Sequence, residues 1–307
     1  MEKIMRLIFC ADPLNARQPD PMYKRETTAA EEQHIGFDLL NFEALVYDNN
    51  PVRAVQRIPQ NDMMGTAVYR GWMLKPPQYR QLYEVLLERG IKLINTPDQY
   101  QHCHYLPDSY PVIEAHTPKT VWLKCDATVQ IETLVELLRP FGDTPLIVKD
   151  FVKSQKHYWN EACYIPHASN AEAVERVVRR FLDLQGDDLN EGLVFREFIA
   201  FKPLTTHSKS GMPLTKEYRL FFVDGELLYT LPYWEQGDYD GIIPEPQYFL
   251  PVAKAVQSRF FTMDIAQAEN GNWFIVELGD GQVAGLPEHA NVIEFYRSLA
   301  HQLDADR

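Results

Sequence analysis

The first third of the chain alternates between short apolar runs and amphipathic segments. The apolar runs predict strands at 5–10, 37–42, 66–70 and 92–95. The segments 21–35 and 76–89 carry helix-forming residues, with apolar positions three and four apart in the second, and a glycine follows each of them. Strands that alternate with helices at this rhythm predict a small open sheet covered by helices, which is an α/β unit.

From about residue 116 the pattern changes to hairpins flanked by helices. The pair Asp224-Gly225 predicts a hairpin over 217–230, and a polar turn at 269–272 predicts a second hairpin over 260–278. Further predicted elements are strands at 146–149 and 192–199, helices at 133–138, 171–184, 246–256 and 288–303, and a mobile loop at 203–213. Antiparallel strands with flanking helices make this second unit α+β.

Composition narrows the class of protein. A chain of 307 residues with 45% hydrophobic content predicts about two domains, which we place at 1–115 and 116–307. Thirty basic against 43 acidic side chains give a net charge of −13, which argues against a general nucleic-acid binder. No apolar run approaches the roughly 18 residues needed to span a bilayer. Four scattered cysteines without CxxC spacing favour a reducing cytoplasm.

Three carboxylates gather around the second predicted hairpin. Asp264 lies within an apolar strand, Glu277 ends the next strand, and Asp280 follows where the chain turns at two glycines. A carboxylate among apolar strand residues is costly unless it is paired or metal-bound, and adjacent antiparallel strands can place Asp264 and Glu277 side by side. Three converging carboxylates suit Mg²⁺, which completes its coordination with phosphates and water. The alternative, solvated turn and edge residues, explains one carboxylate better than all three.

Basic residues form a second group. Lys149 ends the strand 146–149, and Lys153 follows beside a serine, where a lysine can act as a point charge for phosphates. Taken alone, either lysine is better explained as a surface side chain. Arg196 and Arg219 project from apolar strands, and an arginine near a metal can stabilise charge on a transferred phosphoryl group.

Two other motifs suggest chemistry that their surroundings do not support. Residues 124–127 echo the lysine motif of nucleic-acid ligases, but Ala127 stands where that motif needs glycine. The triplet His102-Cys103-His104 lacks a second cluster that would complete a metal site, so a polar loop is the better interpretation.

The order of these elements is more specific than any one of them. A strand ending in lysine is followed by a helix, a strand with an acidic residue before an apolar pair, a strand with arginine, and then aspartate and glutamate on successive strands. In this order the chain resembles the ATP-grasp superfamily, and it looks closest to a small bacterial and phage clade named for one arginine and two lysines. The resemblance runs from the first strand to Gln282, and the segments that carry it are 69–74, 149–154, 194–198, 216–221 and 277–282.

The resemblance implies a fold and a set of roles. The fold would be α+β, an ATP-grasp domain of two lobes that hold ATP between them, preceded by a small α/β pre-ATP-grasp domain. Lys149 and Lys153 would contact the ATP phosphates, and Glu197, with the backbone of Phe198 and Ile199, would hold adenine and ribose. The other implied roles are phosphoryl stabilisation by Arg219, magnesium binding by Asp264, Glu277 and Asp280, and substrate binding by Arg70 and Arg196.

The implied activity is an ATP- and Mg²⁺-dependent ligase that joins a carboxylate to an amine through an acyl phosphate and releases ADP. Its substrates would be small molecules or peptides in the cytoplasm, with no nucleic-acid or membrane partner, and the sequence carries no signal for an oligomeric state. Two alternatives stay open, a phosphotransferase on the same fold and an ATP-binding regulatory module without turnover. The chain departs from the family at Asp280, where many members have Asn, and at 149–159, which lacks the glycines usual in a phosphate-cradling lid. Lys153, Ser154 and Lys156 would have to compensate for these glycines.

Overall fold

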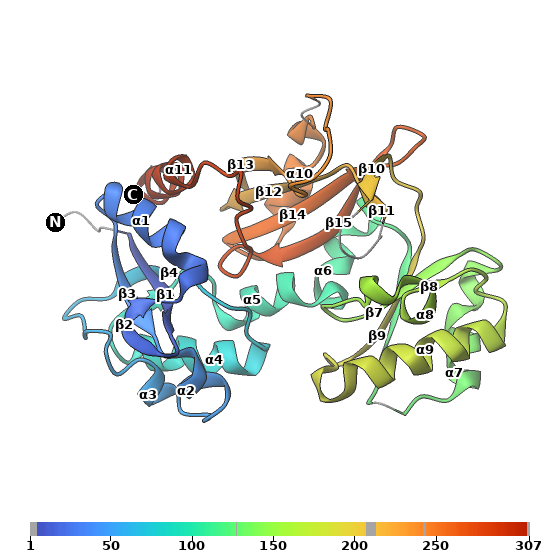
Figure 1. Cartoon of the computed structure of the whole chain (residues 1–307), viewed down its shortest axis with the longest axis horizontal. Helices are drawn as coiled ribbons and strands as arrows, with labels where there is room; N and C mark the ends of the chain where they lie inside the picture. Colours follow the sequence, from blue (N-terminus) through green and yellow to red (C-terminus); the bar gives the residue numbers. More distant parts are fainter. Residues whose placement is uncertain (1–4, 127, 207–212, 242–243, 306–307) are drawn as a thin grey trace.

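Three β-sheets of four or five strands follow one another along the chain (Figure 1). The structure is a computed structural model that describes residues 5–126, 128–206, 213–241 and 244–305. The first sheet forms the left-hand unit of Figure 1, the last sheet lies in the middle, and the second sheet forms the lobe on the right. The predicted α+β architecture, with an α/β unit ahead of two lobes, is confirmed.

The first unit is a small sheet in which β1 is the central strand. Its neighbours β3 and β4 run parallel to it and β2 antiparallel, while β5 pairs with β4. The strands are β1 (Arg6–Asp12), β2 (Asn15–Pro19), β3 (Gly36–Leu40), β4 (Gly65–Arg70) and β5 (Ile91–Leu93). Its helices are α1 (Lys24–Glu32), α2 (Phe42–Val46), α3 (Pro51–Ala54) and α4 (Pro76–Leu87). Because β1 is buried on both faces, it is a continuous apolar run rather than an alternating one.

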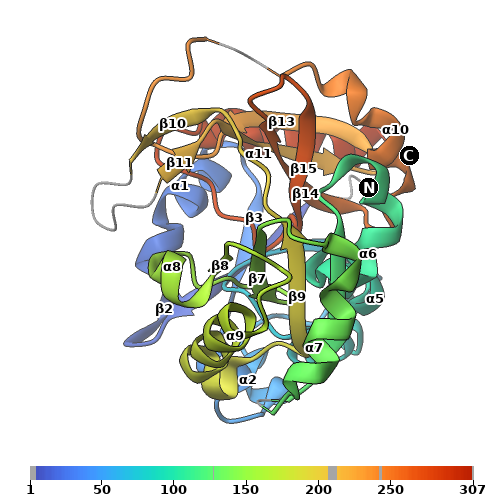
Figure 2. The ribbon, with the colours of Figure 1, turned by 90° about the vertical axis from the view of Figure 1, so that its right-hand side faces the viewer.

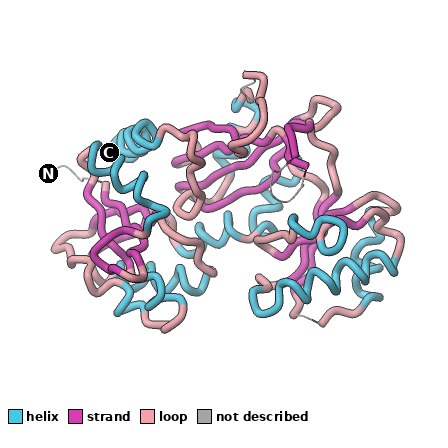
Figure 3. The backbone as a smooth tube through the Cα atoms, viewed as in Figure 1, coloured by secondary structure: helices cyan, strands magenta, loops and turns pink. Residues whose placement is uncertain are grey.

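The second sheet is antiparallel, in the order β6-β9-β7-β8. Its strands are β6 (Thr120–Lys124), β7 (Leu146–Asp150), β8 (Tyr164–Ile165) and β9 (Gly192–Glu197), and its helices are α7 (Ile131–Leu138), α8 (Trp159–Ala162) and α9 (Ala171–Gln185). Asn170 caps α9 by accepting from the N–H of Ala173 at 3.0 Å, and the helix buries Val174, Val177 and Phe181 against the sheet. Figure 3 shows α7 and α9 together on one side of these strands.

The third sheet has the order β13-β12-β14-β15 and is antiparallel throughout. Its strands are β12 (Glu217–Val223), β13 (Glu226–Pro232), β14 (Phe260–Gln267) and β15 (Trp273–Asp280), with helices α10 (Leu250–Ala255) and α11 (Val292–Ala305). The turn between β12 and β13 needs Asp224 and Gly225, because both residues have positive φ, 50° and 78°. Two helices from the middle of the chain, α5 (Pro97–His104) and α6 (Leu106–Ile113), pack against β15.

The predicted elements and the structure differ in a few places. Helices α5 and α6 and strand β6 were not predicted. Each helix has only eight residues with a proline in its first turn, and Pro111 lies inside α6. The predicted loop at 203–213 begins and ends as the paired strands β10 (Pro203–Thr206) and β11 (Pro213–Thr215), while 207–212 lie outside the described residues. The triplet from His102 to His104 is buried in α5 and is not a polar loop. The domain boundary at residue 115 stays a prediction.

Candidate active site between the second and third sheets

Strand register places four charged side chains on one face of the third sheet. Arg219 of β12 lies opposite Asp264 of β14, and Asp264 lies opposite Glu277 of β15. Residues directly opposite one another in antiparallel strands point to the same face. Glu217, two positions before Arg219, shares that face because side chains alternate along a strand. In Figure 2, β7 and β9 of the second sheet lie below β14 and β15.

Arg219 and Asp264 form a bidentate ion pair at the centre of this face. Nε and Nη2 of Arg219 donate to Oδ1 and Oδ2 of Asp264, each at 2.8 Å. The guanidinium also stacks over the ring of Tyr233, with its Cζ 4.7 Å from the ring centre. Burial disfavours the charge on Arg219, but the carboxylate of Asp264 outweighs burial and raises the pKa of Arg219 above its usual value. Arg219 is therefore a fixed, permanent positive charge.

Glu277 makes one of the contacts between the two sheets. Nζ of Lys149, at the end of β7, lies 3.4 Å from Oε2 of Glu277. The side chain of Lys149 is 7% exposed, whereas that of Glu277 is 42% exposed and so can accept another ligand. Desolvation would raise the pKa of Glu277, but the surrounding cations, first Lys149 and then Lys156, hold it below its usual value. The carboxylate is thus ionised over the whole physiological range.

Lys156 is a second lysine of this site, in the segment between β7 and α8. Burial disfavours its charge, but the carboxylates of Glu217 and Glu277 outweigh burial and raise its pKa. Glu217 is 8% exposed and accepts a hydrogen bond from Oγ1 of Thr215 at 2.7 Å, and burial raises the pKa of Glu217.

Lys153, predicted to contact phosphates, has an exposed side chain. Its backbone N–H donates to Asp150 Oδ1 at 2.5 Å in a tight turn.

The predicted nucleotide-holding residues lie at the end of β9. Glu197, Phe198 and Ile199 are all partly exposed. The ring of Phe198 packs edge-on against Tyr164, at 5.2 Å between ring centres, and its N–H already donates to Pro145 O at 2.9 Å. A nucleotide at this segment therefore cannot be bound by the Phe198 N–H unless the hydrogen bond to Pro145 is given up.

Arg196, predicted to bind substrate, instead ties the second sheet to β15. Its Nη1 donates to the carbonyl oxygen of Val276 at 2.6 Å, and its Nη2 donates to Oγ1 of Thr117 at 2.8 Å. The residue is 8% exposed, and burial lowers the pKa of Arg196 to about 10. Its Nε is buried without a partner among the described residues. Because Val276 precedes Glu277, Arg196 fixes the backbone beside the exposed carboxylate.

Asp280 does not join Asp264 and Glu277, contrary to the sequence expectation. β15 continues through residue 280, so an offset of three positions turns Asp280 to the opposite face of the sheet. There it is 1% exposed and accepts hydrogen bonds from Nδ2 of Asn95 at 2.6 Å and from the N–H of Gln282 at 2.9 Å. Burial raises the pKa of Asp280 to about 7. The residue that shares the face of Glu277 is Gly279, which brings no side-chain ligand.

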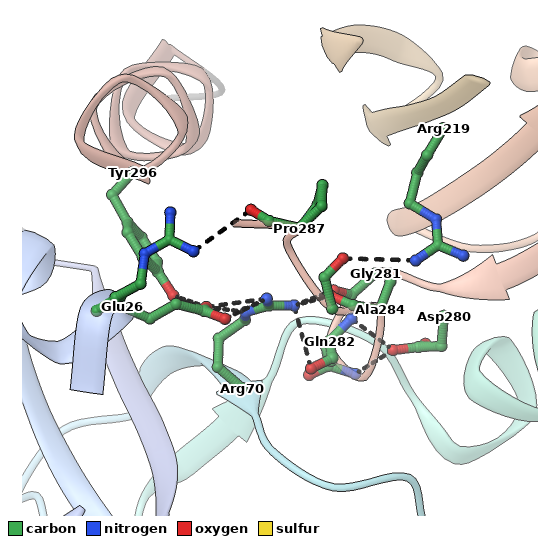
Figure 4. Close-up of polar contacts among 11 residues, drawn as sticks. Glu26, Arg70, Arg219, Asp280, Gly281, Gln282, Ala284, Pro287 and Tyr296 are labelled. Atoms are coloured by element: carbon green, nitrogen blue, oxygen red, sulfur yellow. Dashed lines mark hydrogen bonds and ion pairs between the residues drawn. The ribbon is translucent and has the colours of Figure 1, made fainter. Parts of the chain in front are cut away.

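Arg70, also predicted to bind substrate, is 1% exposed. Its Nε and Nη2 donate to the carboxylate of Glu26 at 2.9 and 3.1 Å, and its Nη1 donates to backbone carbonyls beyond β15, as Figure 4 shows. With its nitrogens turned to protein acceptors, Arg70 lies in the interface between the first unit and the third sheet rather than at a substrate.

The face of the third sheet fits a magnesium nucleotide with two carboxylate ligands. Mg²⁺ is commonly held by one or two carboxylates together with substrate phosphates, and Asp264 and Glu277 supply that pair. Over the described part of the chain, no group of three or more His, Cys, Asp or Glu side chains is placed to bind a metal by itself. The site is therefore suited to a cation that arrives with phosphates, and not to a metal held by protein ligands alone.

A pocket of about 350 Å³ opens beside Arg219. Its lining is apolar apart from Arg219, Glu235 and Gln236, and the other lining residues are Leu214, Leu231, Tyr233, Trp234, Gly285, Leu286 and Pro287. Pockets of this size accommodate small molecules or single side chains. The guanidinium at its wall is the one that pairs with Asp264, so a molecule in this pocket lies next to the face that carries Asp264 and Glu277.

Several residues of the site escaped prediction from the sequence. Glu217 could have been found, because it lies two positions before Arg219 on the same strand. The sequence indicates Lys156 only as one of the residues that would compensate for the missing lid glycines, and His104 lies on an unpredicted helix. Only the tertiary structure places these two side chains near Glu277. His104 is 7% exposed and stacks on Tyr100 at 5.1 Å, and burial lowers its pKa to about 4, with Glu277 and two lysines close enough to influence it. Its imidazole is neutral at physiological pH.

Comparison with known proteins decides the family. A family model for an ATP-grasp domain, family 3 of the clade named for one arginine and two lysines, matches residues 140–299, which include Lys149, Arg219, Asp264 and Glu277. The chain belongs to this ATP-grasp family. The resemblance drawn from the order of motifs is thereby confirmed, while no curated protein matches the chain.

Solved structures share the fold of this ATP-grasp chain over nearly its full length. The D-cycloserine synthetase DcsG is 15% identical, with a TM-score of 0.55 over 98% of this chain and 99% of that one. The ATP-grasp ligase PsnB, complexed with the precursor peptide PsnA2 and AMPPNP, is 13% identical, with a TM-score of 0.58 over 100% of both chains. The D-alanine–D-alanine ligase of Bacillus anthracis, complexed with ATP, is 13% identical, with a TM-score of 0.57 over 100% and 99%. At these identities the likeness establishes the fold.

None of the helices in the described ranges is long and apolar enough to cross a bilayer. Residues 124–127 echo the lysine motif of nucleic-acid ligases, but Lys124 is a surface lysine. Its side chain is exposed and forms an ion pair with Glu191 at 3.0 Å. Ala127 itself lies outside the described residues.

Proposed function

We propose that this chain is an ATP- and Mg²⁺-dependent ligase that activates a carboxylate as an acyl phosphate and joins it to an amine. The observation that carries the proposal is the Lys149–Glu277 contact, which brings a lysine of one sheet against the face that holds Arg219 and Asp264. Membership in the ATP-grasp family supports it, and so do the fold neighbours named as ligases and complexed with ATP or AMPPNP.

In this proposal ATP lies between the two sheets. Lys149 and Lys156 are the charges that face its phosphates, while Asp264 and Glu277 hold the magnesium ion that accompanies them. The ion, when bound, offsets phosphate charge and orients the γ-phosphate. Adenine and ribose lie near Glu197 and Ile199, at the end of β9. Asp280 has no part in metal binding, because it faces the other side of the sheet.

The chemistry proceeds in two balanced steps. A carboxylate oxygen of the first substrate attacks the γ-phosphorus of ATP, the bond to the β–γ bridging oxygen breaks, and ADP leaves. An amine nitrogen then attacks the acyl carbon, phosphate leaves with the former carboxylate oxygen, and the amine loses a proton. Arg219 lies beside the pocket and stabilises the charge that spreads over the phosphoryl oxygens during the first step.

The pocket beside Arg219 is the proposed acceptor site. Its lining favours a substrate with an apolar body, because Leu231, Leu286 and Pro287 offer no hydrogen-bonding side chain. The carboxylate of such a substrate would lie toward Arg219. The substrates stay open between small molecules and the side chains or termini of peptides.

A screen for ADP release tests the proposal. Each well contains the protein, Mg·ATP and one carboxylate, with hydroxylamine as a small amine that converts an acyl phosphate to a hydroxamate. The ligase proposal predicts ADP and hydroxamate in equal amounts for at least one carboxylate. Accumulation of a stable phosphorylated acceptor would indicate a phosphotransferase, and ATP binding without ADP release across a broad panel would favour a regulatory module.

A further inference from the structure

Three arginines hold the backbone of one segment, residues 281–291, which joins β15 to α11 and is called here the β15–α11 loop. Nη1 of Arg70 donates to the carbonyl oxygens of Gly281, Gln282 and Ala284, at 2.6, 3.4 and 2.9 Å. Arg25 of α1 donates to those of Pro287, Glu288 and Ala290, at 3.4, 2.7 and 3.2 Å. Nη1 of Arg219 lies 3.4 Å from the carbonyl oxygen of Gly285. Figure 4 shows Arg70 at one side of the loop and Arg219 at the other.

Arg70 is itself held in place from the first unit. Its Nε and Nη2 engage both oxygens of Glu26, and the hydroxyl of Tyr296 donates to Oε2 of Glu26 at 2.5 Å. All three side chains are buried. A buried ion pair adds little to stability compared with a well-packed apolar pair, but its planar geometry can specify one arrangement. One edge of the guanidinium meets the carboxylate of Glu26 and the other meets the carbonyls of the loop.

The β15–α11 loop also forms one wall of the pocket beside Arg219. Gly285, Leu286 and Pro287 line it together with Tyr233 and Trp234, which directly follow β13. Arg70 binds the carbonyl oxygen of Ala284, the residue directly before this wall. Arg25 binds the carbonyl oxygen of Pro287, the last residue of the wall. The position of the wall therefore depends on two arginines of the first unit, neither of which lines the pocket.

We propose that Arg70 is a positioning residue that sets the acceptor wall of the pocket from the first unit. It contacts neither nucleotide nor acceptor and acts through the carbonyl oxygens of Gly281, Gln282 and Ala284, which lead into the wall. The proposal rests on the ligase function in one respect, that the pocket receives the carboxylate substrate. In this proposal the first unit helps to bind the acceptor, whereas the charged side chains that bind the nucleotide belong to the second and third sheets and the segment after β7.

A purely structural role for Arg70 makes different predictions. If Arg70 only stabilises the interface, its loss lowers the melting temperature and affects nucleotide and acceptor binding together, in proportion to the unfolded fraction. If Arg70 positions the wall, the loop loosens locally and only acceptor binding suffers.

Two variants and a matched control separate these roles. Arg70→Lys keeps a charge for Glu26 but cannot bridge the carboxylate and the carbonyls. The double variant Glu26→Gln/Arg70→Met leaves no buried charge without a partner, so it should fold even if Arg70→Lys does not. The control is Arg89→Met, because Arg89 also grips a backbone carbonyl, that of Ile58 at 2.9 Å from Nε, but entirely within the first unit.

The full-length proteins are compared by amide hydrogen exchange, by calorimetry with Mg·AMPPNP, and by turnover with the carboxylate and hydroxylamine from the screen. For both Arg70 variants we expect the amides at 281–283, whose N–H groups donate to Phe260 and Asp280, to exchange about tenfold faster and the KM for the carboxylate to rise about tenfold. The Kd for Mg·AMPPNP should stay within about twofold, as in Arg89→Met, where the loop also exchanges normally.

Unchanged exchange at 281–283 in both variants would overturn the proposal, and so would a parallel loss of Mg·AMPPNP affinity and carboxylate affinity. The exchange and calorimetry arms need no turnover. If no carboxylate supports ADP release, the ligase function fails, while the exchange result still decides whether Arg70 positions the loop.

Discussion

Arg219 and Asp264 lie opposite each other on β12 and β14, and both oxygens of the carboxylate accept from the guanidinium at 2.8 Å. If Arg219 stabilises the transferring phosphoryl group, its contribution grows as charge develops in the transition state. Arg219→Ala should therefore lower the single-turnover rate about 10²-fold while the Kd for Mg·ATP changes little. Arg219→Lys should restore little, because lysine lacks the planar fork.

Arg259 offers a matched control for this experiment. It also makes a bidentate pair with an aspartate, Asp224, at 2.7 and 2.6 Å on the same sheet, but at the turn away from the charged face. Arg259→Ala should leave the single-turnover rate unchanged. If Arg219→Ala merely lowers the melting temperature and reacts normally per folded molecule, Arg219 has no role in the chemistry.

The lysines should differ in their effect on nucleotide binding. Lys149→Ala and Lys156→Ala remove charges that face Glu277, whereas Lys153 is exposed and Lys124 pairs with Glu191 on the surface. We expect the first two variants to weaken Mg·AMPPNP binding about tenfold or more, and Lys153→Ala and Lys124→Ala less than about twofold. Calorimetry measures all four, and a larger loss for Lys153→Ala than for Lys156→Ala would reverse the assignment of the second lysine.

Magnesium should strengthen nucleotide binding through Glu277. Without the ion, the carboxylates of Asp264 and Glu277 repel the triphosphate, so the affinity for ATP should be much lower in EDTA than in excess Mg²⁺. Glu277→Gln should reduce this magnesium dependence about tenfold. Glu226→Gln, at an exposed pair with Lys254, is the control. Equal affinity in EDTA and in Mg²⁺ for the unaltered protein would remove the metal from the nucleotide site.

Asp280 gives the stability a specific pH dependence. Its pKa is about 7 in the folded protein and near the ordinary 3.8 in the unfolded chain. Between these values the folded state holds a proton that the unfolded state releases, so the contribution of Asp280 to stability is full below pH 3.8 and is lost as the pH rises through 7. Asp280→Asn cannot titrate. The free energy of unfolding of the unaltered protein should thus fall relative to that of the variant by about 2 kcal/mol between about pH 5 and 7.

Urea unfolding of both proteins at a series of pH values measures this difference. If the free energies of unfolding of the unaltered protein and of Asp280→Asn stay equally far apart over that range, the carboxyl of Asp280 does not titrate there. Its pKa would then not be raised by burial, and the buried carboxyl would be ionised throughout.

The order of strands, and with it the family, could be predicted because each strand is a compact apolar run that carries one or two charged residues. Lys149, Asp264 and Glu277 were found in this way, and register then brought Asp264 beside Glu277 as expected. The prediction that Asp280 lies beside Asp264 and Glu277 was wrong, because a turn was expected after Glu277. The strand in fact runs on to residue 280, and an odd offset reverses the face.

The role of Arg70 could not be predicted from its neighbours in the sequence. Its carboxylate partner Glu26 lies 44 positions before it, and its carbonyl partners are backbone atoms that any residue would supply. The sequence marks an arginine at the end of a strand, which is equally consistent with a substrate contact. The position of Lys156 near Glu217 and Glu277 likewise depends on how the segment between β7 and α8 folds against the third sheet.

Transfer of a labelled oxygen tests the central claim most directly. The carboxylate found in the screen is labelled with ¹⁸O in both carboxyl oxygens and incubated with the protein, Mg·ATP and hydroxylamine, and the released phosphate is analysed by mass spectrometry. An acyl phosphate passes one carboxyl oxygen to phosphorus, so each phosphate released should carry one ¹⁸O, and the labelled product should fall with turnover in Arg219→Ala. Phosphate released without label while ATP is consumed would contradict the account.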